Sequence, residues 1–186
     1  MNETLKTIRN RRCIRAYKEE QIKDNELEAV LEAGKYAPSA VNQQSWHFTV
    51  IQNKEVLRRM EQEIKAQFAK SPNPRFQQMA SDEKFRVTYN APTVVLVSGD
   101  EKAIAPNADC AAAMENMMLA AESLNLATCW VNMTISLFSG EKGQEWRSEL
   151  GIPEGYKPFY SLTLGHKAEG DVEAAPRREG TVNYIR

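Results

Sequence analysis

Two runs of this chain are apolar over almost their whole length, and they constrain the fold more than any other feature. Residues 92–98 read PTVVLVS and precede a glycine, and residues 158–165 read PFYSLTLG. A strand with one face in water alternates apolar and polar residues, whereas a continuous apolar run is typical of a strand buried on both faces. These runs therefore predict two buried strands.

The segments around these runs alternate between helical and extended patterns. The predicted helices cover residues 5–10, 54–70, 109–125 and 141–150, and one more that is capped by Asp24 or Asn25 and ends before Pro38. Further strands are predicted at residues 46–52, 127–133 and 182–185. The last of these follows a polar linker, so a second subunit could supply its partner. Residues 71–74 are predicted to form a loop. Helices and strands alternate along the chain without tight hairpin signals, which indicates an α/β or α+β sandwich.

Composition excludes several classes of protein. The 186 residues are 42% hydrophobic, enough for one domain with its own core, and their net charge of −1 argues against a general nucleic-acid binder. No run approaches the ~20 apolar residues that span a bilayer. The start, MNETLKTIRNRR, lacks the apolar stretch of a secretory signal, so we expect a cytoplasmic protein without a membrane partner. Three cysteines without a CxxC pair argue against a disulfide framework or a zinc site.

The charge is distributed unevenly along the chain. Six basic residues gather near the start, at Lys6, Arg9, Arg11, Arg12, Arg15 and Lys18, and a second small pair follows at Arg177 and Arg178. Most charge runs are solvated surface. An arginine fork nevertheless matches phosphate oxygens with two hydrogen bonds, so several arginines near a helix end could hold one phosphate monoester. The GxGxxG and GxxxxGK(S/T) motifs are absent, which excludes nucleotide binding of the Rossmann or P-loop kind.

A second group of polar residues lies in the stretch APSAVNQQSWHF, residues 37–48. Pro38, Ser39 and Asn42 are turn formers, so by itself the stretch is a loop between a helix and a strand. The amides of Asn42 and Gln43 offer both a donor and an acceptor. They could therefore read the edge of a planar heterocycle.

Six blocks follow one another along the chain, and together they resemble a known family. They are RRCIR (11–15), APSAVNQQSWHF (37–48), DCAAAMENMMLAAESLNLATCWV (109–131), LGIPEGY (150–156), LTLGH (162–166) and PRREGTVNYI (176–185). Their order and spacing, over essentially the whole chain, resemble the nitroreductase-like family of FMN-dependent oxidoreductases.

The resemblance implies an architecture. It implies a single FMN-binding domain over residues 1–186, with an α+β fold and a mixed central sheet flanked by helices. It also implies an intertwined homodimer with two FMN sites at the interface, in which residues from about 168 to 186 extend onto the partner subunit. The apolar helix through Met114 and Met118 would lie in that interface.

The resemblance also implies the cofactor-binding residues. Arg11, Arg12 and Arg15 match groups that hold the FMN phosphate and ribityl chain, and Cys13 stands where the family usually has Ser. The loop that meets the flavin ring from the other subunit matches Pro38, Ser39, Ala40 and Asn42. Arg177 and Arg178 match late basic residues that complete the phosphate cage, and residues 132–135 would pass near the ring. No catalytic side chain and no metal ligand are implied.

The predicted function follows from this pattern. NADH or NADPH would reduce the flavin, and an electron-poor acceptor such as a nitroaromatic or a quinone would then be reduced in the same pocket by a ping-pong scheme. One alternative is a flavin-binding sensor or storage protein without turnover. A second is a reductive dehalogenase or flavin-fragmenting relative, which generally carries an added lid segment. A third is a small-anion or nucleic-acid binding module that uses the basic N-terminus.

Overall fold

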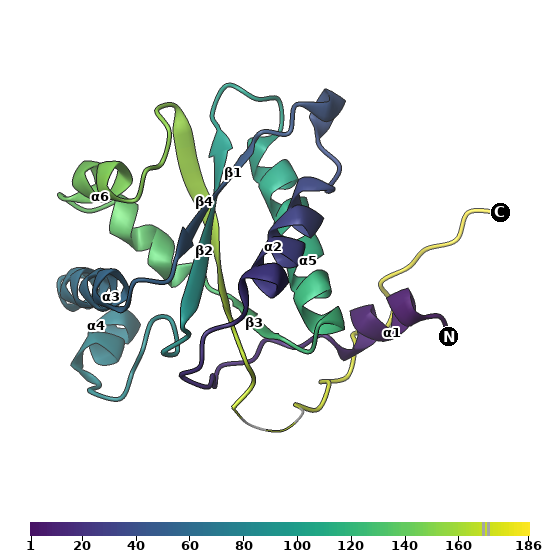
Figure 1. Cartoon of the computed structure of the whole chain (residues 1–186), viewed down its shortest axis with the longest axis horizontal. Coiled ribbons are helices and arrows are strands. Elements are labelled where there is room, and N and C mark those ends of the chain that lie inside the picture. Colours follow the sequence, from purple (N-terminus) through teal and green to yellow (C-terminus); the bar gives the residue numbers. More distant parts are fainter. Residues whose placement is uncertain (169, 171) are drawn as a thin grey trace.

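The computed structural model describes residues 1–168, 170 and 172–186, so residues 169 and 171 of the predicted C-terminal extension lie outside the described residues. The helices are α1 (Glu3–Asn10), α2 (Asp24–Lys35), α3 (Lys54–Ala69), α4 (Pro74–Ser81), α5 (Pro106–Ser123) and α6 (Gly143–Glu149), with 3₁₀ turns η1 (Ala40–Asn42) and η2 (Met133–Phe138). The strands are β1 (Trp46–Ile51), β2 (Thr93–Asp100), β3 (Ala127–Trp130) and β4 (Tyr156–Gly165) (Figure 1).

The strands form one sheet in the order β1-β2-β4-β3. Each neighbouring pair is antiparallel, and among the described residues the parallel pairing expected of a mixed sheet is limited to one isolated bridge between Cys13 and Thr128. The two apolar runs became β2 and β4, the central strands. The α+β fold with a central sheet between helices is therefore confirmed.

Helices cover both faces of the sheet. In Figure 1, α2 and α5 lie on one face, and α3, α4 and α6 lie on the other. Along β2, Val95 and Val97 pack into the cluster with α2 and α5, whereas Val94 and Leu96 pack into the cluster with α3, η2 and α6. Because successive side chains of β2 enter one apolar cluster or the other, the run does not alternate between apolar and polar residues.

One side of helix α5 is buried in the core of its own chain. Met114, Met117 and Met118 are at most 1% exposed and pack against α2 and the sheet. These methionines therefore face the chain's own core, whereas residues 111, 112, 115, 116, 119 and 120 on the other side of the helix are only half-buried. That α5 lies in a subunit interface stays a prediction.

Three element predictions need correction. Residues 71–74 are not only a loop, because Pro74 begins α4 and the Asn73 side chain caps it by accepting from Arg75 N–H at 3.0 Å. The strand predicted over residues 127–133 stops at Trp130, since Asn132 has helical backbone angles and starts η2. Helix α2 is capped at Lys23 rather than Asp24 or Asn25, and the Glu26 carboxylate accepts from Lys23 N–H at 2.9 Å.

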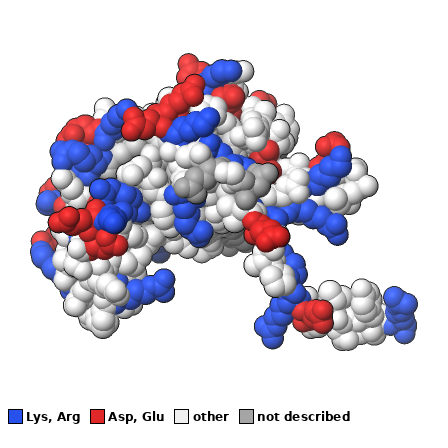
Figure 2. Space-filling model, turned by 90° about the horizontal axis from the view of Figure 1, so that it is seen from below, with Lys and Arg blue, Asp and Glu red and all other residues white. Residues whose placement is uncertain are grey.

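The C-terminal segment leaves the body of the molecule. Residues 182–185, predicted as a strand, are irregular, with Val182, Tyr184 and Ile185 between 66% and 94% exposed. Figures 1 and 2 show the tail extending away from the helices and the sheet, where no strand of the same chain can pair with it. On the face seen in Figure 2, basic and acidic side chains are interspersed over the body.

None of the helices in the described part of the chain has the length and apolar character of a membrane span.

Candidate functional site

The segment that follows α1 runs alongside β3. The helix ends at Arg11, whose N–H donates to the Thr7 carbonyl at 2.9 Å. Ile14 then anchors the segment, since its side chain is 4% exposed and its N–H donates to the Thr128 carbonyl at 2.8 Å. One buried apolar residue thus fixes the segment to the sheet and leaves the flanking arginines nearer the surface.

Two of the predicted phosphate ligands already have partners within the chain. Arg11 is half-buried, and its Nε lies 3.5 Å from Glu115 Oε1. Arg12 is also half-buried and donates to main-chain carbonyls of Arg9 at 2.6 Å and of Val172 at 3.1 Å. Arg12 therefore ties the N-terminal helix to the C-terminal segment as well as lying in the predicted site.

Arg15 is the exposed member of the group. Its guanidinium carbon lies 5.8 Å from the centre of the Tyr89 ring, and a hydrogen bond that Arg15 donates to the Tyr89 hydroxyl raises the pKa of Arg15. Tyr89 and Asn90 both have φ of 55°, a left-handed conformation that is uncommon outside glycine. Among the residues that the structure describes, Arg15 has no carboxylate within ion-pair distance, so its charge is available to an anion.

Cys13 has an unusual environment for a thiol. The neighbouring Cys129 side chain lowers the pKa of Cys13 below its ordinary value, with contributions from the Trp130 main chain and from Arg11, whose Nη1 lies 3.9 Å from the Cys13 Sγ. Burial of the half-exposed side chain opposes this shift only in part. These neighbours therefore favour the thiolate form of Cys13 relative to an ordinary thiol.

In protein freed of FMN, the rate at which iodoacetamide alkylates Cys13 should rise less between about pH 7 and about pH 9 than the rate for an ordinary thiol, because the neighbours of Cys13 lower its pKa. A thiol with the ordinary pKa of 9.0 gains thiolate about tenfold per pH unit below that value. Mass spectrometry of the Cys13 peptide after short exposure gives the rate. The Cys13→Ser variant is the control for labelling at other positions, and a rate that rises about tenfold per pH unit would contradict the assigned environment.

The loop between α2 and β1 is held by a buried carboxylate. Asp109, in the first turn of α5, is 3% exposed and accepts from Ala40 N–H at 3.0 Å and from Ser45 Oγ at 2.8 Å. Between these anchors the backbone is left-handed at Val41, Asn42 and Gln44, with φ of 44°, 57° and 48°. Such values are rare for a β-branched residue, and residues of this kind concentrate at functional sites.

The polar groups of this loop divide into internal and exposed sets. Ser39 Oγ accepts from Gln44 N–H at 3.0 Å, and Gln43 Oε1 accepts from Ile104 N–H at 2.8 Å, so these atoms support the loop itself. Pro38 and Asn42 are exposed, and Asn42 Oδ1 accepts from the Gln44 amide at 3.2 Å. Of the two amides expected to read a heterocycle, Asn42 remains at the surface while the oxygen of Gln43 is used within the chain.

One chain does not bring the predicted site together. The loop is anchored to Asp109 in the first turn of α5, whereas Arg11 contacts Glu115 near the middle of that helix and Cys13 pairs with Thr128 beyond its C-terminal end (Figure 1). With 18 residues, α5 is about 27 Å long. Arg177 and Arg178 are exposed on the projecting tail, where Arg177 donates to the Ala175 carbonyl at 3.2 Å. The predicted ligands therefore form three separate groups.

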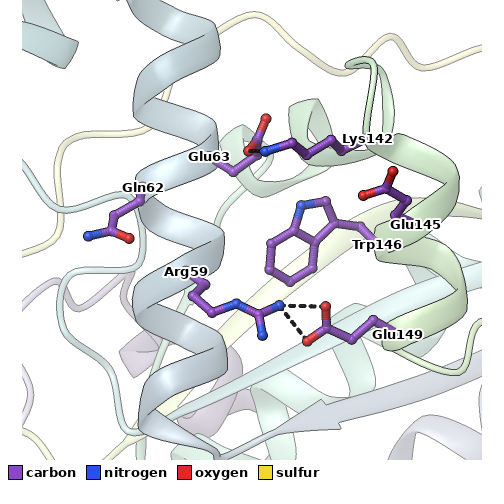
Figure 3. Close-up of a pocket in the computed structure, with 7 residues that line it drawn as sticks. All are labelled: Arg59, Gln62, Glu63, Lys142, Glu145, Trp146 and Glu149. Carbon is purple, nitrogen blue, oxygen red and sulfur yellow. Dashed lines mark hydrogen bonds and ion pairs between the residues drawn. The ribbon is translucent and has the colours of Figure 1, made fainter.

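A hollow elsewhere on the molecule is occupied by its own charges. It has a volume of about 400 Å³ between α3 and α6 and contains none of the predicted ligands (Figure 3). Arg59 donates to Glu149 at 2.6 Å and stacks over Trp146, and Lys142 donates to Glu63 at 3.0 Å. These pairings satisfy its main charged groups, so it is a weak candidate for ligand binding.

Comparisons with known proteins agree on one family. The model of the nitroreductase family matches residues 8–166. The chain is 38% identical to a nitroreductase from Bacteroides fragilis solved with bound FMN, with a TM-score of 0.93 and both chains fully covered. It is 33% identical to an FMN-bound nitroreductase from Desulfitobacterium hafniense, with a TM-score of 0.90 and the same coverage. The FMN reductase (NAD(P)H) of Bacillus subtilis is 26% identical, over 99% of this chain and 74% of that protein.

Proposed function

We propose, since this chain belongs to the nitroreductase family, that it is an FMN-dependent oxidoreductase that takes electrons from NADH or NADPH. Its similarity to nitroreductases that contain FMN, and to an NAD(P)H-dependent FMN reductase, supports this assignment. Within this chain, the proposal rests on the exposed guanidinium of Arg15. It belongs to the same short segment as Arg11 and Arg12, where the family pattern has the phosphate.

The N-terminal segment fits a phosphate group. It presents three guanidinium groups within five residues, and among the described residues only Arg11 has a carboxylate partner. Guanidinium forks bind phosphate through strong, charge-assisted hydrogen bonds. Cys13 is a weaker donor than serine, but its main-chain N–H keeps its capacity to donate. An adjacent phosphate would favour the protonated Cys13 thiol, since like charges repel.

The protein's part in the reaction is binding and orientation. FMN, when bound, supplies the chemistry by accepting hydride from a reduced nicotinamide and passing electrons to an acceptor. Arg11, Arg12 and Arg15 would hold its anionic end, and the loop fixed by Asp109 would present Pro38, Ser39, Ala40 and Asn42 to the ring. Positive charge near a reduced, anionic group stabilises it in a site that excludes water. None of these roles requires a side chain that transfers a proton.

A complete site needs two chains in this proposal. Because the loop is anchored at the start of α5 and the arginine segment runs from the middle of that helix to β3, the loop of a second copy would meet the segment of the first. The tail from about residue 168 to 186 would extend onto the partner, which would cover the exposed Val182, Tyr184 and Ile185 and bring Arg177 and Arg178 toward a phosphate. Burial of these apolar side chains would favour association.

The acceptor is proposed as a flat, electron-poor molecule, a nitroaromatic or a quinone. It would enter after the oxidised nicotinamide leaves, so that the two substrates use one pocket in turn by a ping-pong scheme. The exposed, polar rim formed by Asn42 and Gln44 supports an open pocket of this kind.

The purified protein should be yellow, and NADH or NADPH should bleach it. Steady-state oxidation of NAD(P)H with menadione or nitrobenzene then separates an oxidoreductase from a flavin store or sensor. Parallel initial-rate lines as the acceptor concentration varies would support the ping-pong scheme. A colourless protein that neither retains nor takes up FMN would refute the proposal, and a yellow protein without turnover would refute its catalytic part.

A further inference from the structure

The segment that carries the arginines is fixed to the sheet at two points. Its isolated bridges pair Cys13 with Thr128 of β3 and Tyr17 with Lys167, which follows the end of β4. Main-chain hydrogen bonds of 2.9 and 3.1 Å on the two sides of Tyr17 join the segment to the chain just after β4. Arg15 lies between the two bridges, so the path of the segment from one strand to the other sets where its side chain begins.

The Tyr17 hydroxyl holds the peptide unit that precedes Arg15. Its oxygen lies 2.7 Å from the Ile14 carbonyl oxygen and 2.7 Å from Thr163 Oγ1. A carbonyl only accepts, so the tyrosine donates its single hydrogen to Ile14, and the Thr163 hydroxyl donates to the tyrosine oxygen. The Ile14 carbonyl and the Arg15 N–H belong to one planar unit. A fixed carbonyl direction therefore fixes the plane from which the Arg15 side chain leaves the backbone.

Packing holds the ring of Tyr17 in place. A Cβ on Gly165 of β4 would lie 3.1 Å from Tyr17 Cδ1 and 2.9 Å from Pro92 Cδ, so the ring rests closely on the backbone at this glycine. Glycine permits the close approach because it has no side chain. Tyr17 is half-buried, whereas Arg15 is exposed. The tyrosine is thus a support that is held at its ring and at its hydroxyl, beneath an arginine that faces solvent.

We propose that Tyr17 is a positioning residue for the cofactor phosphate: by holding the Ile14 carbonyl, it directs Arg15 toward the phosphate of FMN. This inference rests on the proposed function. The far end of the Arg15 side chain lies over the Tyr89 ring, 5.8 Å from its centre, and the near end leaves the backbone that Tyr17 holds. Hydrogen bonds between a guanidinium and a phosphate need good alignment of the donors. Tyr17 acts through Arg15 and does not itself bind the phosphate.

The test compares the affinity of the purified full-length protein for FMN with its affinity for riboflavin, which has the same ring and ribityl chain but no phosphate. Quenching of flavin fluorescence measures both. Tyr17→Phe keeps the ring and removes the hydroxyl, and it should weaken FMN binding by about five- to tenfold. Riboflavin binding should stay close to that of the native protein, so the ratio of the two affinities falls. A merely structural role would weaken the binding of both flavins alike.

Thr163→Val is the matched control. It removes the other hydroxyl of the pair, while Tyr17 still donates to Ile14. Thr163 is fully buried, so this variant should lower thermal stability but keep the native ratio of affinities. When Arg15→Ala is already present, Tyr17→Phe should change the ratio no further, because both changes act through one guanidinium.

A second variant acts on the ring instead of the hydroxyl. Gly165→Ala adds a methyl group against the Tyr17 ring and should also lower the ratio, so it decides the matter where Tyr17→Phe does not fold. A native ratio in the folded Tyr17→Phe protein, or an equal loss for both flavins, would overturn the role of Tyr17 and leave FMN binding by the native protein intact. A native protein that binds FMN no more tightly than riboflavin would instead refute the phosphate site of the proposed function, and the role of Tyr17 with it.

Discussion

Replacing Arg12 and Arg15 together with alanine should weaken FMN binding by about two orders of magnitude or more. A hydrogen bond to a charged group contributes about 1.5–3 kcal/mol, and each 1.4 kcal/mol is about a factor of ten in affinity. Titration of FMN followed by the quenching of its fluorescence measures the loss. Binding by the native protein should also weaken as salt is added, because the contacts are electrostatic.

The single variants distinguish the two arginines. Arg15 is exposed and contacts the Tyr89 ring and hydroxyl, whereas Arg12 is held by main-chain carbonyls of the N-terminal helix and the tail. Arg15→Ala should therefore cost affinity with little change in thermal stability, while Arg12→Ala should lower both. Arg9→Ala is the matched control, since that exposed side chain lies on α1 outside the predicted site. Unchanged FMN affinity in the double variant would contradict the assignment of Arg12 and Arg15 as phosphate ligands.

The central sheet could be predicted because its strands obey a simple physical rule. Val94, Val95, Leu96 and Val97 are each fully buried, so both faces of β2 are apolar over these four residues. Helix α4 was harder to predict, since Asn73 and Pro74 are common in turns and equally suited to a helix cap and first position.

The sequence allowed the residue types of the candidate site to be predicted, but not the contacts that those residues make. The arginines and the turn-forming loop are local in sequence, and their chemistry is visible there. The residues that support them are far away along the chain: Asp109 lies 69 positions from Ala40, and Cys129 and Tyr89 meet Cys13 and Arg15 only after the sheet forms. The acid in the first turn of a predicted helix was the single available signal for Asp109, and it is equally explained by the helix dipole.

Asp109→Ala should lower the unfolding free energy by about 3 kcal/mol, because it leaves two donors without their acceptor. Loss of a partner costs a buried polar group about 1–3 kcal/mol. Ser45 is 3% exposed and Ala40 N–H is part of the loop between α2 and β1, so water replaces the carboxylate poorly at both. In a chain of 186 residues this corresponds to a fall in Tm of about 10 °C, measured by calorimetry at one fixed protein concentration.

Two further variants isolate the role of the carboxylate in this loop. Ser45→Ala removes one of the two donors and should lower the Tm by less than half as much, whereas Asp109→Asn keeps one acceptor oxygen and should fall between the two. If the loop meets the flavin as proposed, Asp109→Ala should also weaken FMN binding at a temperature well below its Tm, because Val41, Asn42 and Gln44 lose the anchor that offsets their left-handed backbone. A Tm equal to that of the native protein would show that the carboxylate does not hold the loop. A lowered Tm with unchanged FMN affinity would keep its structural role and remove the loop from the cofactor site.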